Sequence, residues 1–204
     1  MNYLDFNRQF KKFKIFSLND IKKADPGFYR ARLNELQKKG YLIKIINKYY
    51  IFSDLTVDEA MLFFIAHKIH SPSYISCEMA LSYYSVIPES VFQIISVNAK
   101  KTCIFNTPIA TFKYQKLKSN FMFGYQLIKS QTIFFKIADL EKAILDYLYF
   151  HRELKTNLDF DSLRFNKMLL AEKLNLQKLT NYLKIYENKQ LTKRVDALKT
   201  YIYN

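Results

Sequence analysis

The side chains in this sequence best suited to binding chemistry are basic and amide groups concentrated between residues 28 and 48. Arginine and asparagine carry hydrogen-bond donors that suit base edges and phosphates, and lysine supplies a point charge for phosphate. The pattern predicts contact with DNA, and the alternative is an ordinary solvated face of a basic protein. The predicted contacts to bases or backbone are Arg30, Arg32 and Asn34, and the predicted phosphate contacts are Lys38, Lys44 and Lys48.

Two short predicted helices would position the first of these side chains. Ser17-Leu18-Asn19-Asp20 is a near match to a capping box, so a helix is expected from there to about Lys23. Asp25-Pro26 suits an N-cap followed by a first-turn proline, and a second helix is expected over residues 28–39 before Gly40. Ser17, at the start of the first helix, is a further candidate contact with DNA.

The second helix separates its side chains into two faces at about 100° per residue. Its inward face is predicted to carry Tyr29, Leu33 and Leu36. Small and polar residues occupy the opposite face, where they could approach a ligand closely: Gly27, Arg30, Ala31, Asn34 and Lys38.

A predicted β-hairpin would carry the remaining lysines. Residues 42–46 and 49–52 are rich in β-branched and aromatic residues and flank a two-residue turn, Asn47-Lys48. Helix, turn, helix and hairpin is the order of a winged helix-turn-helix. Asparagine tolerates a positive φ in such a turn and lysine is less suited to one, which leaves the geometry of the wing tip and its reach into the minor groove open.

The charge of the chain also favours an anionic partner. The 204 residues have a formal net charge of +14 and a pI of about 9.6. The alternative explanation is base composition. An AT-rich genome would by itself produce 26 lysines against 6 arginines, together with many Ile, Asn, Tyr and Phe. Residues 1–55 carry a net +7 on about a quarter of the chain, so the excess is concentrated where the DNA contacts are predicted.

The rest of the chain predicts an α+β protein in two domains, residues 1–55 and 56–204, joined by a short ordered junction. We expect an amphipathic helix over residues 2–12, a helix over 57–68 capped by Thr56, and another over 77–84 capped by Ser76. Strands are expected over 91–97, 102–106, 110–117, 124–129 and 132–137, then a helix over 140–150 capped by Asp139, and helices over 160–173, 176–187 and 190–203. Cys77 and Cys103 are expected to be free, semi-buried thiols in a cytoplasmic protein.

No pattern in the sequence predicts catalysis, a cofactor or a metal. His67 and His70 have a spacing that can bind a metal on a helix, but no third ligand stands near them. Asp139 and Glu141 fit a cap and a first helical turn, and Asp146 is expected on the exposed side of that helix. A nuclease-like Glu-x-Lys fragment, Glu187-Asn188-Lys189, falls at a break between predicted helices rather than on a strand.

Residues 12–150 carry a series of motifs that resembles the AbiEi family of antitoxins. The motifs keep the order and spacing of that family: Pro72-Ser73-Tyr74-Ile75-Ser76, Ala80-Leu81-Ser82-Tyr83-Tyr84, Ile87-Pro88-Glu89, Ile95-Ser96-Val97, Phe105-Asn106-Thr107-Pro108, Phe123-Gly124-Tyr125 and the run Ile137 to Asp146. The C-terminal helices are compatible with the family but not diagnostic.

The resemblance implies a bacterial antitoxin of a type IV toxin–antitoxin system linked to phage defence. Its winged helix-turn-helix would bind inverted repeats in its own promoter as a repressor. The mixed α/β domain with its helical tail would neutralise a nucleotidyltransferase-like toxin without needing a stable complex. Carried onto this chain, the resemblance places Ser17 to Asp20 at the first motif helix, Arg30 to Leu36 on the recognition helix and Leu42 to Phe52 on the wing. The alternative is a stand-alone winged-helix regulator whose second domain senses a ligand.

Overall fold

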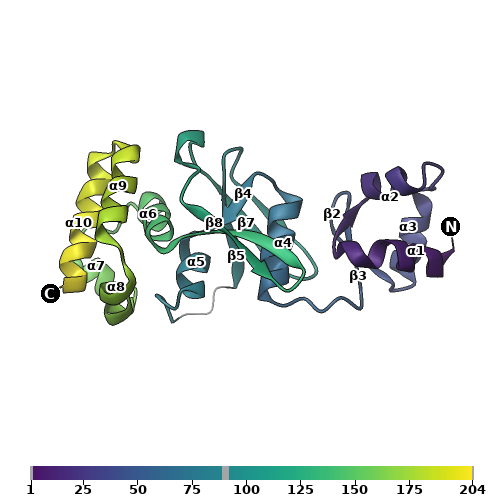
Figure 1. Ribbon diagram of the computed structural model, residues 1–204, viewed down its shortest axis with the longest axis horizontal. Helices are drawn as coiled ribbons and strands as arrows, with labels where there is room; N and C mark the ends of the chain where they lie inside the picture. The colour runs from purple at the N-terminus through teal and green to yellow at the C-terminus, as the bar shows by residue number, and fades with distance from the viewer. Residues whose placement is uncertain (1, 89–91, 204) are drawn as a thin grey trace.

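The computed structural model describes residues 2–88 and 92–203 and has an α+β fold that ends in a helical segment. Its elements follow one another along the long axis of the molecule (Figure 1). The N-terminal part, residues 2–52, lies at one end, a six-stranded sheet lies in the middle, and the C-terminal helices form the other end.

The N-terminal part contains three helices, one 3-10 turn and a three-stranded antiparallel sheet. The predicted hairpin strands are confirmed at the predicted residues, and a third short strand pairs with the second of them to give the order β1-β3-β2. The elements are α1 (Tyr3–Phe10), η1 (Lys11–Phe13), β1 (Phe16–Ser17), α2 (Leu18–Ala24), α3 (Ala31–Lys38), β2 (Leu42–Ile46) and β3 (Tyr49–Phe52).

Aromatic rings form the core of this part. Phe6 lies at the centre, with ring centroids 5.7, 5.8 and 5.9 Å from those of Phe16, Phe28 and Phe52. Phe10 joins it from the next turn of α1. Aromatic pairs at these distances add to the energy of simple burial, so α1 holds the small sheet and the helix pair together.

The start of α3 was predicted wrongly. Asp25 is the C-cap of α2 rather than the N-cap of α3, and Pro26 and Gly27 form a turn in which the Phe28 amide donates to the Asp25 carbonyl (3.0 Å). This turn buries Phe28 against Phe6 and leaves Tyr29 77% exposed instead of inward. Burial of a phenylalanine in the core therefore outweighed the local capping signal.

The second part, from residue 56 onward, is built on a mixed six-stranded sheet with the order β6-β7-β5-β4-β9-β8. Helix α4 lies on the side of the sheet toward the N-terminal part, and α5 and α6 lie on the other side (Figure 1). The sheet and its flanking elements are α4 (Glu59–Ile69), β4 (Ser73–Ile75), α5 (Cys77–Tyr83), β5 (Gln93–Asn98), β6 (Cys103–Asn106), β7 (Thr111–Lys116), η2 (Ser119–Phe121), β8 (Tyr125–Ser130), β9 (Ile133–Ala138) and α6 (Leu140–Phe150).

All five predicted strands are present, although Val91 at the start of one, and Glu89 of the family motif, lie outside the described residues. Helix α6 has its predicted bounds and its predicted cap, because the Asp139 Oδ1 accepts the Lys142 amide (2.9 Å). Helix α4 is capped by Asp58 and not by Thr56: the Asp58 Oδ1 accepts the Met61 amide (2.8 Å). Cys77 is completely buried rather than semi-buried, whereas Cys103 is partly exposed, and both are free thiols.

The C-terminal segment consists of four helices, because the predicted helix over residues 160–173 is split in two. Arg164 adopts a left-handed conformation (φ 49°), and the Asn166 side chain then caps a new helix by accepting the Leu169 amide (3.1 Å). The break lets Phe160 and Phe165 both enter the core. The helices are α7 (Asn157–Asp161), α8 (Lys167–Lys173), α9 (Leu176–Tyr186) and α10 (Lys189–Tyr203).

The two parts share buried side chains at their junction. Ile15, Ile45 and Ile51, all from the N-terminal part, belong to the apolar core of the second part rather than to the aromatic core around Phe6. The boundary near residue 55 therefore marks a change of elements, while the core of the second part extends across it.

A buried polar cluster ties the sheet to the C-terminal helices. The side chains of Lys142 and Asp146 are fully buried and form an ion pair, and Asp146 was wrongly predicted to be exposed. Asp146 also accepts hydrogen bonds from the hydroxyls of Tyr74 (2.9 Å), Ser76 (2.7 Å) and Tyr186 (2.9 Å). Ser76 therefore stands at the predicted cap position but bonds to Asp146 instead of capping α5. A buried carboxylate of this kind is stable only when fully paired, so these interactions fix α6 and α9 on the sheet.

None of the helices within the described ranges combines the length and the apolar character needed to cross a bilayer.

Candidate nucleic-acid interface

The predicted DNA-contacting side chains of α3 lie on its exposed surface. Arg30, at the N-cap position, Asn34 and Lys38 are all exposed, while Leu33 and Leu36 on the opposite face are buried in the aromatic core. The Asn34 Oδ1 accepts a long hydrogen bond from the Gln37 side-chain Nε2 (3.4 Å). The Asn34 side-chain nitrogen is left as a donor toward solvent.

The structure brings Arg30 and the β2–β3 hairpin turn together. A hollow of about 300 Å³ is lined by Arg30 from the start of α3, Asn47 and Lys48 from the hairpin turn, and Leu18, Asn19 and Tyr50. Arg30 and Lys48 are 18 positions apart in the sequence but face the same space. Two basic side chains and two amides around one hollow form a surface of hydrogen-bond donors and positive charge that suits phosphate oxygens.

The β2–β3 hairpin turn has a defined backbone geometry. Lys48 takes a positive φ of 81°, the conformation that glycine or asparagine adopts most readily, whereas Asn47 is not left-handed. The Lys48 carbonyl accepts the Leu18 amide at the start of α2 (3.2 Å). The hairpin turn is therefore tied to the start of α2 and lies beside Arg30 rather than extending freely.

Three of the predicted contacts lie elsewhere. Ser17 is buried in a capping box: its Oγ accepts the Asp20 amide (3.2 Å), and the Asp20 carboxylate accepts both the Ser17 amide (2.8 Å) and the Ser17 hydroxyl (2.7 Å). Its hydroxyl is thus engaged in capping the N-terminus of α2. Arg32 is half-buried on α3, and Lys44 lines a hollow of about 500 Å³ between β2 and the β6–β7 region, beside Ile104 and Phe105.

The exposed basic groups of this surface have no ionic partners within the described part of the chain. The ion pairs found there involve Lys11, Lys142, His151, Lys167, Lys178 and Lys199, and none of the predicted DNA contacts. The positive charge of α3 and the β2–β3 turn is therefore available to an anionic ligand.

Sequence reasoning missed Asn19 and Tyr50 as members of this surface. Asn19 has a weak signal, because it is a polar residue in the first turn of α2, two positions after the predicted contact Ser17. Tyr50 gave no such signal: it is buried, and only the packing of β3 against β1 places it at the hollow.

The groups considered for other chemistry are engaged in structural contacts. His67 Nδ1 lies 3.1 Å from the Ser73 carbonyl oxygen, and burial lowers the pKa values of both His67 and His70. In the described residues, no three His, Cys, Asp or Glu side chains gather as a metal site would need.

The acidic residues around α6 are likewise used for packing. Asp139 caps α6 and accepts the Tyr182 hydroxyl (2.9 Å), and Glu141 accepts the Asn175 amide (2.9 Å). Lys178 bridges both carboxylates at 3.2 and 2.9 Å. Glu187 is the left-handed C-cap of α9 and is not on a strand.

Comparison with models of known protein families gave no match to the chain, and a search of curated proteins found none of significant similarity.

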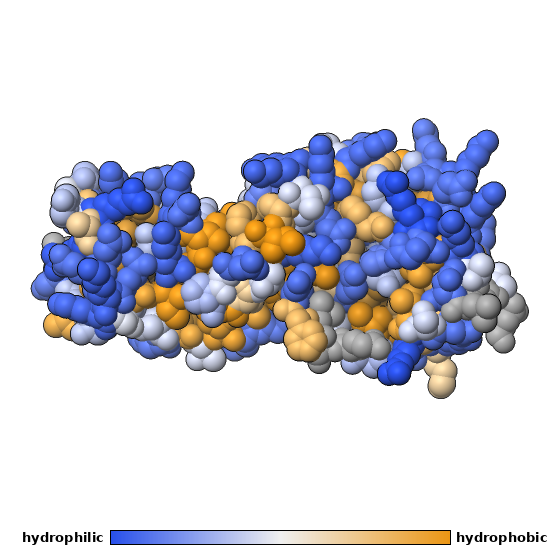
Figure 2. All heavy atoms as spheres, turned by 180° about the vertical axis from the view of Figure 1, so that it is seen from behind, coloured by the Kyte–Doolittle hydropathy of each residue, from blue (hydrophilic) through white to orange (hydrophobic). Residues whose placement is uncertain are grey.

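Polar and apolar side chains are unevenly distributed over the molecular surface. On the face shown in Figure 2, hydrophilic side chains cover both ends of the molecule, and apolar side chains gather between them. On this face, the N-terminal end is therefore largely polar.

Proposed function

We propose that this chain is a DNA-binding antitoxin of the AbiEi type, which represses its own promoter and counteracts a nucleotidyltransferase-like toxin. In this proposal the N-terminal part is a winged helix-turn-helix, α3 is its recognition helix, and the β2–β3 hairpin is its wing. Arg30 and Asn34 read bases or backbone, and Lys38 and Lys48 contact phosphate. The chain needs neither a catalytic group nor a cofactor for this role, and the cytoplasm is its expected location.

The observation that carries the DNA-binding half is the shared hollow of Arg30 and Lys48. It joins the first turn of α3 to the hairpin turn, and no carboxylate of the described residues neutralises either charge. The net +7 of residues 1–55 supports an anionic ligand at this end. Lys44 remains a phosphate contact in the proposal. It lies at the periphery of the proposed surface, because it lines a different hollow together with residues of β6.

The toxin-neutralising half is supported by the motif series alone. Several of its residues, among them Tyr74, Ser76 and Asp146, form the buried polar cluster described above, and they are therefore scaffold residues.

The DNA-binding half is tested with a duplex carrying the region upstream of the gene. Arg30→Ala should weaken binding by about 1–3 kcal/mol and relax specificity at one base pair, because the guanidinium donors to one base or phosphate are removed. Arg152→Ala, which removes an exposed arginine outside the N-terminal part, is the matched control. Equal affinities of both variants would mean that α3 does not read DNA.

The antitoxin half is tested by co-expression with the adjacent open reading frame, scored by growth. The full-length Arg30→Ala variant is preferable to a fragment of residues 56–204, because truncation would expose the core that Ile15, Ile45 and Ile51 complete. Rescue of growth by a variant that no longer represses would separate neutralisation from DNA binding. Failure of the wild-type chain to rescue would remove the antitoxin assignment.

A stand-alone regulator with a ligand-sensing second part is the second candidate, favoured by one hollow of about 510 Å³. Its walls are largely apolar, with Tyr147 and Phe165 among them, and they include Lys113 and Glu78, whose carboxylate pairs with His151. Such a site suits a small, largely apolar ligand that carries a carboxylate. A thermal-shift screen with free amino acids would favour this candidate if stabilisation disappears in Lys113→Ala and the same ligand alters DNA affinity.

A further inference from the structure

A second basic hollow lies at the junction between the N-terminal part and the sheet. It has a volume of about 640 Å³, and its walls come from η1, α2 and β3 on one side and from α4 and the β8–β9 turn on the other. Four lysines line it: Lys12 in η1, Lys14 directly after η1, Lys23 on α2 and Lys68 on α4. Lys68 belongs to the second part, so both parts of the chain contribute charge.

The positive charge of this hollow is not compensated within the described residues. None of the four lysines forms an ion pair with a carboxylate there. Among the described residues that line the hollow, Asp20 is the only one with a carboxylate, and it is held in the capping box by Ser17. Like charges in one hollow repel one another, and a bound anion removes that cost.

Two of the lysines rest on aromatic rings that line the same space. The Lys12 Nζ lies 5.3 Å from the ring centroid of Phe13, and the Lys68 Nζ lies 5.3 Å from that of Phe64. Such contacts limit the freedom of a lysine while leaving its ammonium group without a carboxylate partner.

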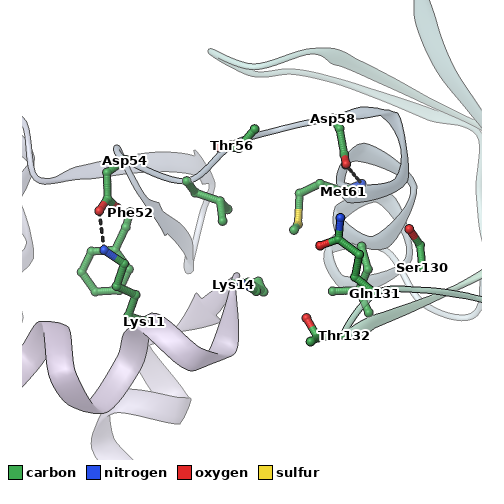
Figure 3. A pocket seen from close by; sticks show the side chains of 12 residues that line it. Lys11, Lys14, Phe52, Asp54, Thr56, Asp58, Met61, Ser130, Gln131 and Thr132 are labelled. Carbon is green, nitrogen blue, oxygen red and sulfur yellow. Dashed lines mark hydrogen bonds and ion pairs between the residues drawn. The ribbon is translucent and has the colours of Figure 1, made fainter.

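A hollow on the other side of Lys14 provides a contrast in charge. Figure 3 shows Lys11, Lys14 and Asp54 facing Met61, Gln131 and Thr132 across the junction. There the charges balance, because Lys11 pairs with Asp54 at 2.5 Å and Asp58 caps α4. The uncompensated charge thus lies on the side that continues toward α3.

The basic hollow adjoins the proposed recognition surface at one residue of α2. Asn19, exposed on α2, lines both the junction hollow and the hollow of Arg30 and Lys48. Basic and amide side chains therefore line two neighbouring hollows, with Arg30 and Lys48 in one and the four lysines in the other. An extended row of separate ammonium groups suits a repeating polyanion better than one small anion.

We propose that the junction hollow is a second phosphate-contact surface for double-stranded DNA, which extends the footprint of the N-terminal part onto α4. This inference rests on the proposed DNA-binding function. In it, Lys12, Lys23 and Lys68 contact the backbone beyond the base pairs read by α3. The second part thus contributes directly to DNA affinity, without adding sequence specificity.

The test measures the salt dependence of binding of the full chain to the upstream duplex and to an unrelated duplex of equal length. Combined replacement Lys12→Gln, Lys23→Gln and Lys68→Gln should reduce the slope of log K against log salt by about 0.9 for each phosphate that is no longer neutralised, on both duplexes. The control carries Lys173→Gln, Lys184→Gln and Lys193→Gln, three exposed lysines of the C-terminal helices, with the same change of net charge. Arginine at positions 12, 23 and 68 should preserve the wild-type slope.

The outcomes separate this inference from the function on which it rests. If wild-type binding is specific and depends on Arg30, but the junction variant keeps its slope, the junction inference is overturned and the proposed function stands. An equal decrease of slope in the control variant overturns it as well, because the effect is then one of net charge. Absence of binding to either duplex, or preferred binding to a structured RNA of equal length, overturns DNA as the partner at both sites.

Discussion

Lys142 and Asp146 form a fully buried ion pair that connects the sheet of the second part to its C-terminal helices. The Lys142 ammonium also lies 2.7 Å from the Tyr186 hydroxyl and over the rings of Tyr74 and Phe123. Burial raises the pKa values of Tyr74 and Tyr186 well above the ordinary range, so both hydroxyls stay protonated as donors to Asp146.

Replacing Lys142 with Met should lower the free energy of unfolding by about 3–5 kcal/mol, because the buried Asp146 carboxylate loses its counter-charge. The double variant Lys142→Met, Asp146→Leu removes both charges but leaves three hydroxyls without their acceptor. It should therefore remain clearly less stable than the wild type. Urea unfolding of the three proteins checks both statements, and a double variant of wild-type stability would contradict them.

His151 should make stability depend on pH. Its Nε2 lies 2.9 Å from a Glu78 oxygen and its Nδ1 lies 2.7 Å from a Glu153 oxygen. The hydrogen bond to Glu78, helped by the one to Glu153 and opposed by burial, raises the pKa of His151 above its ordinary value. The stabilisation is thus fully present below about pH 6.5, the unfolded value, and is lost as pH rises through the higher folded pKa.

The melting temperature of the wild type minus that of His151→Gln should accordingly be largest near about pH 5.5–6 and shrink toward about pH 8.5. His67 and His70, whose pKa values burial lowers, titrate in both proteins and largely cancel in this difference. A difference that grows with pH would mean that His151 is neutral in the folded protein.

At the scale of elements, the β2–β3 turn combines a strained residue with a proposed phosphate contact. Lys48→Gly should raise the free energy of unfolding by about 0.5–1 kcal/mol, because glycine adopts the observed φ of 81° without strain. The same change should reduce the salt slope of DNA binding by about 0.9. Lys48→Ala, which removes the charge but keeps the strain, is the control, and it should change the slope alone.

Elements whose signals are local were predictable from the sequence. The strands Leu42–Ile46 and Tyr49–Phe52 and the helix Leu140–Phe150 agree at both ends, because residue alternation, a turn and a capping aspartate define them within a few positions. The start of α3 was not predictable, because the burial of Phe28 against Phe6 is a tertiary contact. The exposed face of α3 was foreseen in its main members, Arg30, Asn34 and Lys38.

The burial of α6 on all of its sides could not be predicted from the sequence. Asp146 was placed on the solvent side of α6 because helical periodicity assigns one apolar face, whereas β4 and α9 supply partners for the polar face too. Lys48 and Arg30 line one hollow, and Lys14 and Thr132 line another. These placements likewise depend on how separate elements pack.

At the scale of the whole molecule, the junction should make the two parts unfold together. Ile51 is completely buried in the core of the second part, so Ile51→Ala should cost about 2–5 kcal/mol. Hydrogen exchange of peptides from α1 and from α6 should show reduced protection in both. Leu4→Ala, which changes a side chain that is 72% exposed, should alter neither. Reduced protection in α1 alone would indicate independent folding units.

The three isoleucines at the junction also limit how this chain can change by recombination. A gene fusion that joined residues 1–55 to the second half of a relative would bring Ile15, Ile45 and Ile51 against a core that evolved around other side chains. Viable chimaeras would then need matching substitutions in the core of the second part. Inheritance should therefore keep the two halves together, and the exposed surface of α3 should diverge by point substitution rather than by exchange of whole N-terminal parts.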